Sequence, residues 1–137
     1  MPPPGELEKE LLLEQVAESE GIYPAAAYEF IQNGVAYTVS RLHGPRIQNG
    51  VCRHVTGQQL CHGLREMAIA QWGYLAQTVL RTWNITATVD FGRMVFILVR
   101  HGALSTLPGD TLDDFRNVYD FKKSFESAYR IRNQCQS

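Results

Sequence analysis

The sequence predicts an all-α or mainly α protein, a compact bundle of five to six helices with at most one small β-hairpin. Apolar residues recur at the three- and four-residue spacing of a buried helix face along most of the chain. Glycine and proline divide the chain into segments of helix length. Its 137 residues, 45% of them hydrophobic, fit one domain with a core of its own. We expect a disordered start at residues 1–5, a single helical domain at 6–132 and a frayed tail at 133–137.

The first two expected helices have recognisable ends. Residues 6–20 carry glutamates in the first turn, where the helix dipole favours negative charge, and apolar residues on one face. Gly21 ends this helix. Pro24 suits the first turn of the next helix, because its missing N–H has no helical partner there. Gly44, followed by a proline, stops the second helix.

Three further helices follow in the middle of the chain. Thr56 and Gln59 match a capping box, in which two side chains satisfy free N–H groups at a helix start. Gly73 separates the third helix from the fourth. Thr88 is expected to cap the fifth helix, which Gly102 closes. Because the fifth helix is apolar almost all round, we expect it at the centre of the bundle.

Two stretches leave alternatives open. Residues 46–53 contain Asn49 and Gly50, the pair typical of a tight hairpin turn, so they form either a small hairpin or a plain loop. Residues 103–110 form either a short hairpin or an extended arm. Asp120 then begins the last helix.

The expected core combines the apolar faces of all the helices. Its members recur at helical spacing along each segment. They are Tyr28, Ile31, Val35, Leu60, Leu64, Met67, Val79, Trp83, Phe91, Val95, Leu98 and Phe121.

The composition favours a cytoplasmic protein. No apolar run approaches the roughly 20 residues that a bilayer span requires. The first residues lack the basic and apolar regions of a secretory signal. Three cysteines, an odd number, favour reduced thiols over a disulfide framework. We therefore expect no contact with a membrane.

Charge is segregated along the chain, although the net charge is only −1. Residues 1–29 carry seven acids against one lysine, a balance of −6, and residues 30–101 carry seven arginines against two acids, a balance of +5. Such asymmetry indicates either an anionic partner for the middle section or neutralisation of the two sections within the fold.

Several ordered segments of this sequence form a recognisable series. They are Arg53-His54-Val55-Thr56-Gly57-Gln58-Gln59-Leu60, Trp83-Asn84-Ile85, Thr88-Val89-Asp90-Phe91-Gly92, Asp114-Phe115 and Tyr119-Asp120-Phe121. Over roughly residues 23–125 the chain thereby resembles a family of short proteins of unknown function found mainly in planctomycete and verrucomicrobial genomes. The resemblance implies a cytoplasmic bacterial protein of this length, and it implies no activity, cofactor or site residue.

Neither a metal site nor a catalytic site is predicted. Cys52, His54, Cys61 and His62 lie within eleven residues, but their spacing differs from that of zinc sites, and adjacent Cys61 and His62 point about 100° apart on a helix. No nucleophile stands in a local catalytic motif, and no pair of carboxylates has a recognisable acid–base spacing. We therefore expect no catalytic residue, no metal and no cofactor.

The sequence does predict one candidate anion or carboxylate site, at the start of the third helix. Helix N-termini favour negative groups, and the guanidinium of Arg53 suits a bidentate carboxylate. The site would comprise Arg53, His54, Thr56 and Gly57. Its occupant would be either an internal carboxylate, from Asp113, Asp114 or Asp120, or an external phosphate or carboxylate ligand.

Two functions remain open. Fourteen aromatic residues, with Tyr23, Tyr74, Tyr119 and Tyr129 near the ends of elements, favour a non-enzymatic interaction or adaptor module with an unknown protein partner. The alternative is a helix-turn-helix or winged-helix-like protein that binds nucleic acid through the arginine-rich section 41–100. Its candidate contacts are Arg41, Arg46, Arg53, Arg65, Gln77 and Arg81.

Overall fold

The protein is mainly helical, as the sequence predicts. The computed structural model describes residues 4–43, 55–104 and 111–125, and no strand occurs in these ranges. The helices are α1 (Pro4–Glu20), α2 (Ala25–His43), α3 (Gly57–Trp72), α4 (Ala76–Thr82) and α5 (Thr88–Arg100), with the short 3₁₀ helices η1 (Gly73–Leu75) and η2 (Leu112–Phe115). Residues 121–125 are also helical. None of the helices in the described ranges is long and apolar enough to cross a bilayer.

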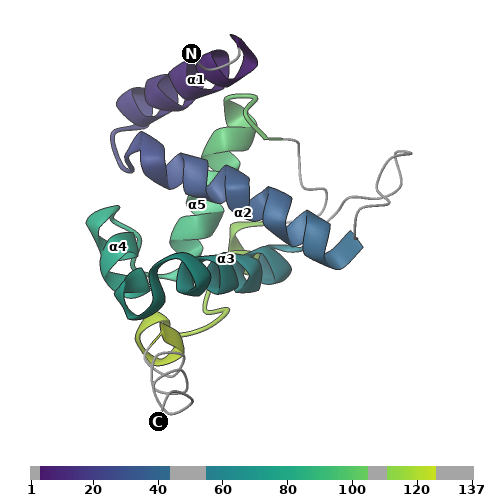
Figure 1. Ribbon diagram of the computed structural model, residues 1–137, viewed down its shortest axis with the longest axis vertical. Coiled ribbons are helices and arrows are strands. Elements are labelled where there is room, and N and C mark those ends of the chain that lie inside the picture. Colours follow the sequence, from purple (N-terminus) through teal and green to yellow (C-terminus); the bar gives the residue numbers. More distant parts are fainter. Residues whose placement is uncertain (1–3, 44–54, 105–110, 126–137) are drawn as a thin grey trace.

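α5 packs against α2, α3 and η2, and in Figure 1 it runs behind α2. α2 packs along α3 and also contacts α5, while α1 lies against α2 at one end of the molecule. η2 packs on α5 and on the start of α3. Most residues of α5 are buried, as expected of a helix within the bundle, but one face of the helix is exposed.

Local signals set most helix ends where the sequence predicts them. Gly21, with a φ of +69°, ends α1, although α1 begins at Pro4 and so includes two residues of the expected disordered start. The Pro24 carbonyl accepts hydrogen bonds from Ala27 and Tyr28, which places Pro24 immediately before α2. At the end of α5, Gly102 has a φ of +76°, and the next N–H donates to the Leu98 carbonyl at 2.8 Å.

The capping box at α3 is confirmed. The Gln59 N–H donates to Thr56 Oγ1 at 3.0 Å, and the Thr56 N–H donates to Gln59 Oε1 at 2.9 Å. Thr88, in contrast, does not cap α5. The helix is preceded by Ala87, and the carboxylate of Asp90 accepts hydrogen bonds from the N–H groups of Thr86 and Ala87, just before the helix. A carboxylate in the first turn satisfies two donors at once, which leaves the Thr88 hydroxyl for another contact.

α2 and α3 cross closely because each helix has a glycine at the crossing. A Cβ on Gly34 would overlap the side chain of Leu64, and a Cβ on Gly63 would overlap the side chain of Thr38. The Thr38 hydroxyl donates to the Gly34 carbonyl at 2.7 Å, so it is satisfied within α2. The two backbones therefore approach without burying an unpaired polar group at this point.

Phe115 fills a slot between α3 and α5 and is fully buried. Glycines form two of its walls, since a Cβ on Gly57 would lie 2.9 Å from the ring and one on Gly92 would lie 2.6 Å from it. The Thr88 hydroxyl donates to the Phe115 carbonyl. Gly57, Thr88 and Phe115 thus have a structural role.

Most of the expected core is buried, and the largest departure is on α4. Val35 and Trp83 are partly buried against the core. Val79 is partly exposed, and Ala76 and Leu80 take the inward positions instead. The helix is only seven residues long and follows η1, so its register is set by that 3₁₀ turn and differs from the uninterrupted helical spacing.

Cys61 is predicted to be unreactive in the folded protein. Its side chain is fully buried, and desolvation raises the pKa of its thiol to about 12, which suppresses the reactive thiolate. In a Cys52→Ser/Cys135→Ser variant, which retains Cys61 alone, Ellman's reagent should release no thiolate at pH 8 and one equivalent after unfolding in urea. Rapid reaction in native buffer would show that Cys61 is accessible.

Candidate functional site

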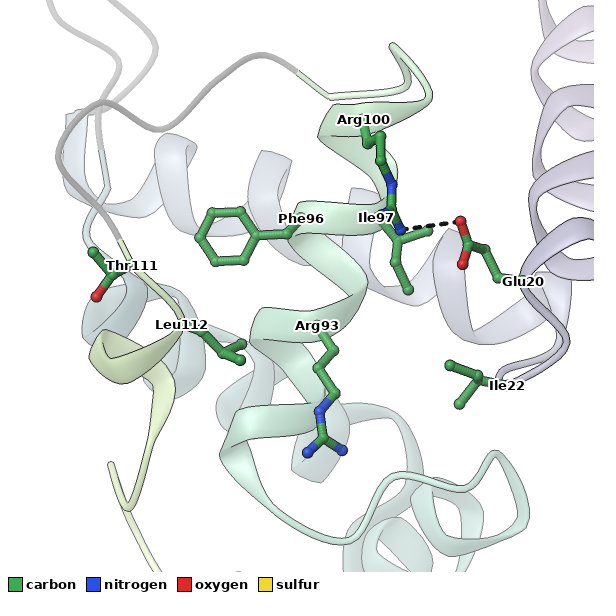
Figure 2. A pocket seen from close by; sticks show the side chains of 8 residues that line it. All are labelled: Glu20, Ile22, Arg93, Phe96, Ile97, Arg100, Thr111 and Leu112. Carbon is green, nitrogen blue, oxygen red and sulfur yellow. Dashed lines mark hydrogen bonds and ion pairs between the residues drawn. The ribbon is translucent and has the colours of Figure 1, made fainter.

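A pocket of about 600 Å³ lies on the outer face of α5. Figure 2 shows it as an open groove between η2 on one side and the corner that joins α1 to α2 on the other. We call it the α5 groove. It is lined by Glu20, Ile22, Arg93, Phe96, Ile97, Arg100, Thr111 and Leu112.

One face of α5 forms the floor of the groove. Phe96, Ile97 and Arg100 follow Arg93 by three, four and seven residues, which places all four on the same side of the helix. The arginines lie at the two ends of this face, about 10.5 Å apart along the axis at 1.5 Å per residue. Their side chains are 50% and 67% exposed. The expectation of an apolar surface almost all round α5 is therefore wrong for this face.

The walls come from segments that are far apart in the sequence. Ile22, 48% exposed, belongs to the α1–α2 corner. Leu112 and Thr111 belong to the start of η2, and Phe96 points toward them (Figure 2). The Thr111 N–H donates to Asp114 Oδ2 at 2.7 Å, and the buried Phe115 fixes the other end of η2. The η2 wall is thus held in place by the Asp114 carboxylate and the buried Phe115 ring, neither of which lines the groove.

A buried carboxylate holds one end of the floor in place. Asp90 accepts hydrogen bonds from the Tyr23 hydroxyl at 2.6 Å and from the N–H groups of Thr86 and Ala87 at 2.9 and 3.1 Å. Arg93 Nη1 lies 3.1 Å from the same carboxylate. Burial, with the hydrogen bond to Asp90, raises the pKa of Tyr23, so its hydroxyl stays a donor at neutral pH. This network ties the α1–α2 corner to the start of α5.

An ion pair holds the other end. Arg100 Nη2 and His101 Nε2 lie 3.1 and 3.0 Å from Glu20 Oε1, and Figure 2 shows Arg100 reaching across to Glu20. The hydrogen bond with His101, assisted by the charge of Arg100, lowers the pKa of Glu20 against the opposing effect of burial. The pair joins the last residue of α1 to the end of α5.

Replacing Glu20 should have an effect that depends on pH. Because its pKa is lowered in the folded state, the ionised Glu20 stabilises the fold at neutral pH. This stabilisation should disappear as the pH falls from the ordinary value of 4.5 through the lower folded pKa. The urea midpoint of Glu20→Gln should therefore lie below that of the wild type at pH 7 and approach it at pH 3. Glu29→Gln, at an exposed position of α2, is the control; an equal pH-dependent gap in that variant would contradict the role given to the ion pair.

The predicted anion site at the start of α3 is only partly within the described residues. Arg53 and His54 lie outside them. Thr56 uses its hydroxyl in the capping box, and the ring of Phe115 packs on Gly57. This side of the α3 N-terminus is therefore covered by an aromatic ring.

The three aspartates suggested as internal partners for Arg53 each have a local role. Asp113 forms an ion pair with Arg116 at 2.8 Å. Asp114 accepts from the Thr111 N–H at the start of η2, and Asp120 accepts from the Lys123 N–H at 3.1 Å, at the start of the last helix. Helix capping and a local ion pair thus account for these acids.

The candidate nucleic-acid contacts are spread over several elements. Arg41, on α2, forms an ion pair with Glu66 at 3.1 Å, and Arg65 donates to the Ser124 carbonyl at 3.0 Å. Arg81 is exposed on α4, where Gln77 is partly buried. Arg46 and Arg53 lie outside the described residues. The described arginines of this set therefore lie on three different helices, and two of them already have protein partners.

The cysteine and histidine cluster is also divided. Cys61 is buried in the core, whereas neighbouring His62 is exposed and packs on the ring of Tyr119 at 5.5 Å. Cys52 and His54 lie outside the described residues. Within the described part of the chain, no three His, Cys, Asp or Glu side chains are grouped as they would be around a metal ion.

The tyrosines that suggested an interaction surface have different environments. Tyr23 is buried on Asp90, and the Tyr119 hydroxyl donates to the Cys61 carbonyl at 2.9 Å. Tyr74 is 64% exposed on η1, and Tyr129 lies outside the described residues.

The α5 groove was not predicted from the sequence. The available signal was the pair of arginines, Arg93 and Arg100, on either side of Phe96 and Ile97. No family model, curated protein or solved structure matches this chain.

Proposed function

We propose that this protein is a non-enzymatic interaction or adaptor module, and that its α5 groove binds a protein helix that carries acidic and apolar side chains on one face. The observation that carries this proposal is the arrangement of Arg93 and Arg100 at the two ends of a floor formed by Phe96 and Ile97. A helix laid in an apolar groove is a recurrent mode of peptide recognition.

The chemistry of the lining favours an acidic occupant. The groove holds two arginines and one glutamate, so its lining is positive by one charge. An arginine has five N–H donors, and a single contact with Glu20 or Asp90 leaves others available for a carboxylate of the partner. Ile22 and Leu112 add apolar contact on both sides. A partner helix with an acidic side chain at each end of an apolar face would therefore meet an arginine at both ends of the groove.

The cytoplasm is the proposed place of action. Support comes from Cys61, which is a free, buried cysteine, and from the odd number of cysteines in the sequence. Membership of the planctomycete and verrucomicrobial family is also a proposal, supported by the meeting of its segments around Phe115.

A direct test uses a fluorescent synthetic helical peptide with glutamate and leucine on one face. The wild-type protein should raise its anisotropy, and Ile22→Glu should weaken binding about tenfold or more, because it places a negative charge on the wall of the groove. Leu75→Glu is the matched control, since Leu75 is also 48% exposed but lies on η1, outside the groove. It should bind the peptide like the wild type.

Two results would overturn the proposal. One is equal weakening by Ile22→Glu and Leu75→Glu. The other is the absence of peptide binding together with salt-sensitive binding of a fluorescent DNA duplex, which would favour the nucleic-acid alternative. A peptide with lysine in place of glutamate provides the charge control and should not bind.

A further inference from the structure

α1 presents an exposed face of the kind that the α5 groove should accept. Leu13 and Val16 are buried against the rest of the protein. Leu11, Glu14 and Glu18 are exposed, and their spacing of three and seven residues puts them on one side of the helix. Leu11 is 49% exposed. The face thus combines an apolar side chain with two carboxylates.

The position of α1 in the fold leaves this face uncovered. α1 lies at one end of the molecule, where α2 is its main neighbour (Figure 1). The positive φ of Gly21 and the ion pair of Glu20 with Arg100 fix where α1 ends relative to α5. Because the buried face of α1 packs on its own chain, the face with Leu11, Glu14 and Glu18 is available to another molecule.

Two sections of the chain carry opposite net charge, so two copies of the chain can attract each other. Residues 1–29 carry a balance of −6, and the section that contains α5 carries +5. Within one chain, Glu20 at the end of α1 reaches Arg100 of the groove. The acids farther along α1 have the right sign for the arginine ends of a groove in a second molecule.

We infer that the partner helix is α1 of a second copy of this chain. Each copy would place the exposed face of its α1 in the α5 groove of the other copy, while its α1 stays packed on its own chain. This inference rests on the function proposed above. In a two-fold dimer each contact occurs twice. The doubling matters because a stable interface buries about 1,600 Å² in total, more than a single short helix face provides.

The dimer is tested by analytical ultracentrifugation of the full chain at low and high salt. The wild type should dimerise, and salt should weaken the dimer because exposed charge pairs are screened. Glu14→Lys/Glu18→Lys, which reverses the α1 face, should raise the dissociation constant more than about tenfold. Ile22→Glu/Arg100→Glu, which reverses the groove, should do the same. Glu29→Lys, on an exposed position of α2, is the control for a change of charge away from both surfaces.

Mixing the two reversed variants gives the sharpest result. In the mixed dimer, one contact pairs a native α1 with a native groove, and the other pairs a lysine-bearing α1 with a glutamate-bearing groove. Both contacts are then complementary, so the mixture should dimerise although each variant alone does not. Circular dichroism and urea unfolding establish that both variants are folded.

Three outcomes would overturn the inference. They are a wild type that is monomeric at all concentrations, a dimer that neither double variant weakens, and a mixture that stays monomeric. A monomeric wild type that still binds the glutamate–leucine peptide through Ile22 would refute the dimer and leave the proposed function standing. Loss of peptide binding as well would refute both.

Discussion

Phe115→Ala should destabilise the protein by about 3–5 kcal/mol, the usual cost of removing a fully buried phenylalanine. The expected cost lies at the upper end of this range because the surrounding residues cannot easily move in to fill the cavity. Its walls include the backbones of two helices at Gly57 and Gly92, which are held by their own helical hydrogen bonds. The free energy of unfolding in urea measures the effect. Typical domains have only about 5–15 kcal/mol in total, so a large fraction of stability would be lost.

Phe96→Ala is the matched control for this prediction. Phe96 is also an aromatic residue on α5 and packs edge-on to Phe115 at 6.1 Å, but it is only partly buried at the groove. Its replacement should cost clearly less than that of Phe115. If the two substitutions cost the same, Phe115 does not have the structural role that its burial indicates.

Asp90→Ala should have the second largest effect, about 3 kcal/mol. The substitution removes the carboxylate that caps α5, which is worth about 1 kcal/mol, and leaves the buried Tyr23 hydroxyl without its acceptor, which costs about 1–3 kcal/mol. Arg93 loses its ion pair too, but its side chain is half exposed and remains solvated. Urea unfolding at pH 7 provides the measurement.

A double-mutant cycle with Tyr23→Phe separates these contributions. When Tyr23 has no hydroxyl, Asp90→Ala no longer leaves a buried donor without an acceptor. The loss in the free energy of unfolding should then fall toward that of the lost cap alone. Strict additivity of the two substitutions would contradict the contact as the source of stability. Asp114→Ala is a useful comparison, because Asp114 also caps a helix start but accepts no buried hydroxyl. It should cost less than Asp90→Ala.

Short-range signals explain which parts of the fold were predictable. The capping box of Thr56 and Gln59 and the terminal glycine Gly102 are complete within a few residues, so the sequence contains all that they need. The helical spacing of Tyr28, Ile31 and Leu64 likewise placed them correctly in the core. These features depend on local geometry alone.

Long-range contacts explain what the sequence did not reveal. The contact of Asp90 with Tyr23 could not be predicted, because the two residues lie 67 positions apart in the sequence. Phe115 is absent from the predicted core, because residues 103–110 are predicted as a hairpin or arm. The 3₁₀ helix that follows has only four residues and is too short to show a helical spacing of apolar residues. Thr88 is predicted to cap α5, but the carboxylate of Asp90 has that role. The Thr88 hydroxyl donates to the Phe115 carbonyl instead.

The groove itself illustrates the same limit. Arg93 and Arg100 are visible in the sequence, and their spacing with Phe96 and Ile97 could have marked a distinct face of α5. The walls, however, come from Ile22 and Leu112, whose approach depends on the turn after α1 and on η2. The sequence places neither wall next to α5, so a depression between them could not be predicted.

The docking role of the α5 groove is tested most directly by NMR. The amide resonances of the ¹⁵N-labelled wild-type protein would be followed during titration with the glutamate–leucine peptide. A docking groove on α5 predicts that shift changes concentrate on Ile22, on residues 93–100 and on Leu112, and that η1 and α4 stay unchanged. Changes centred on η1 and α4, with α5 unaffected, would contradict it.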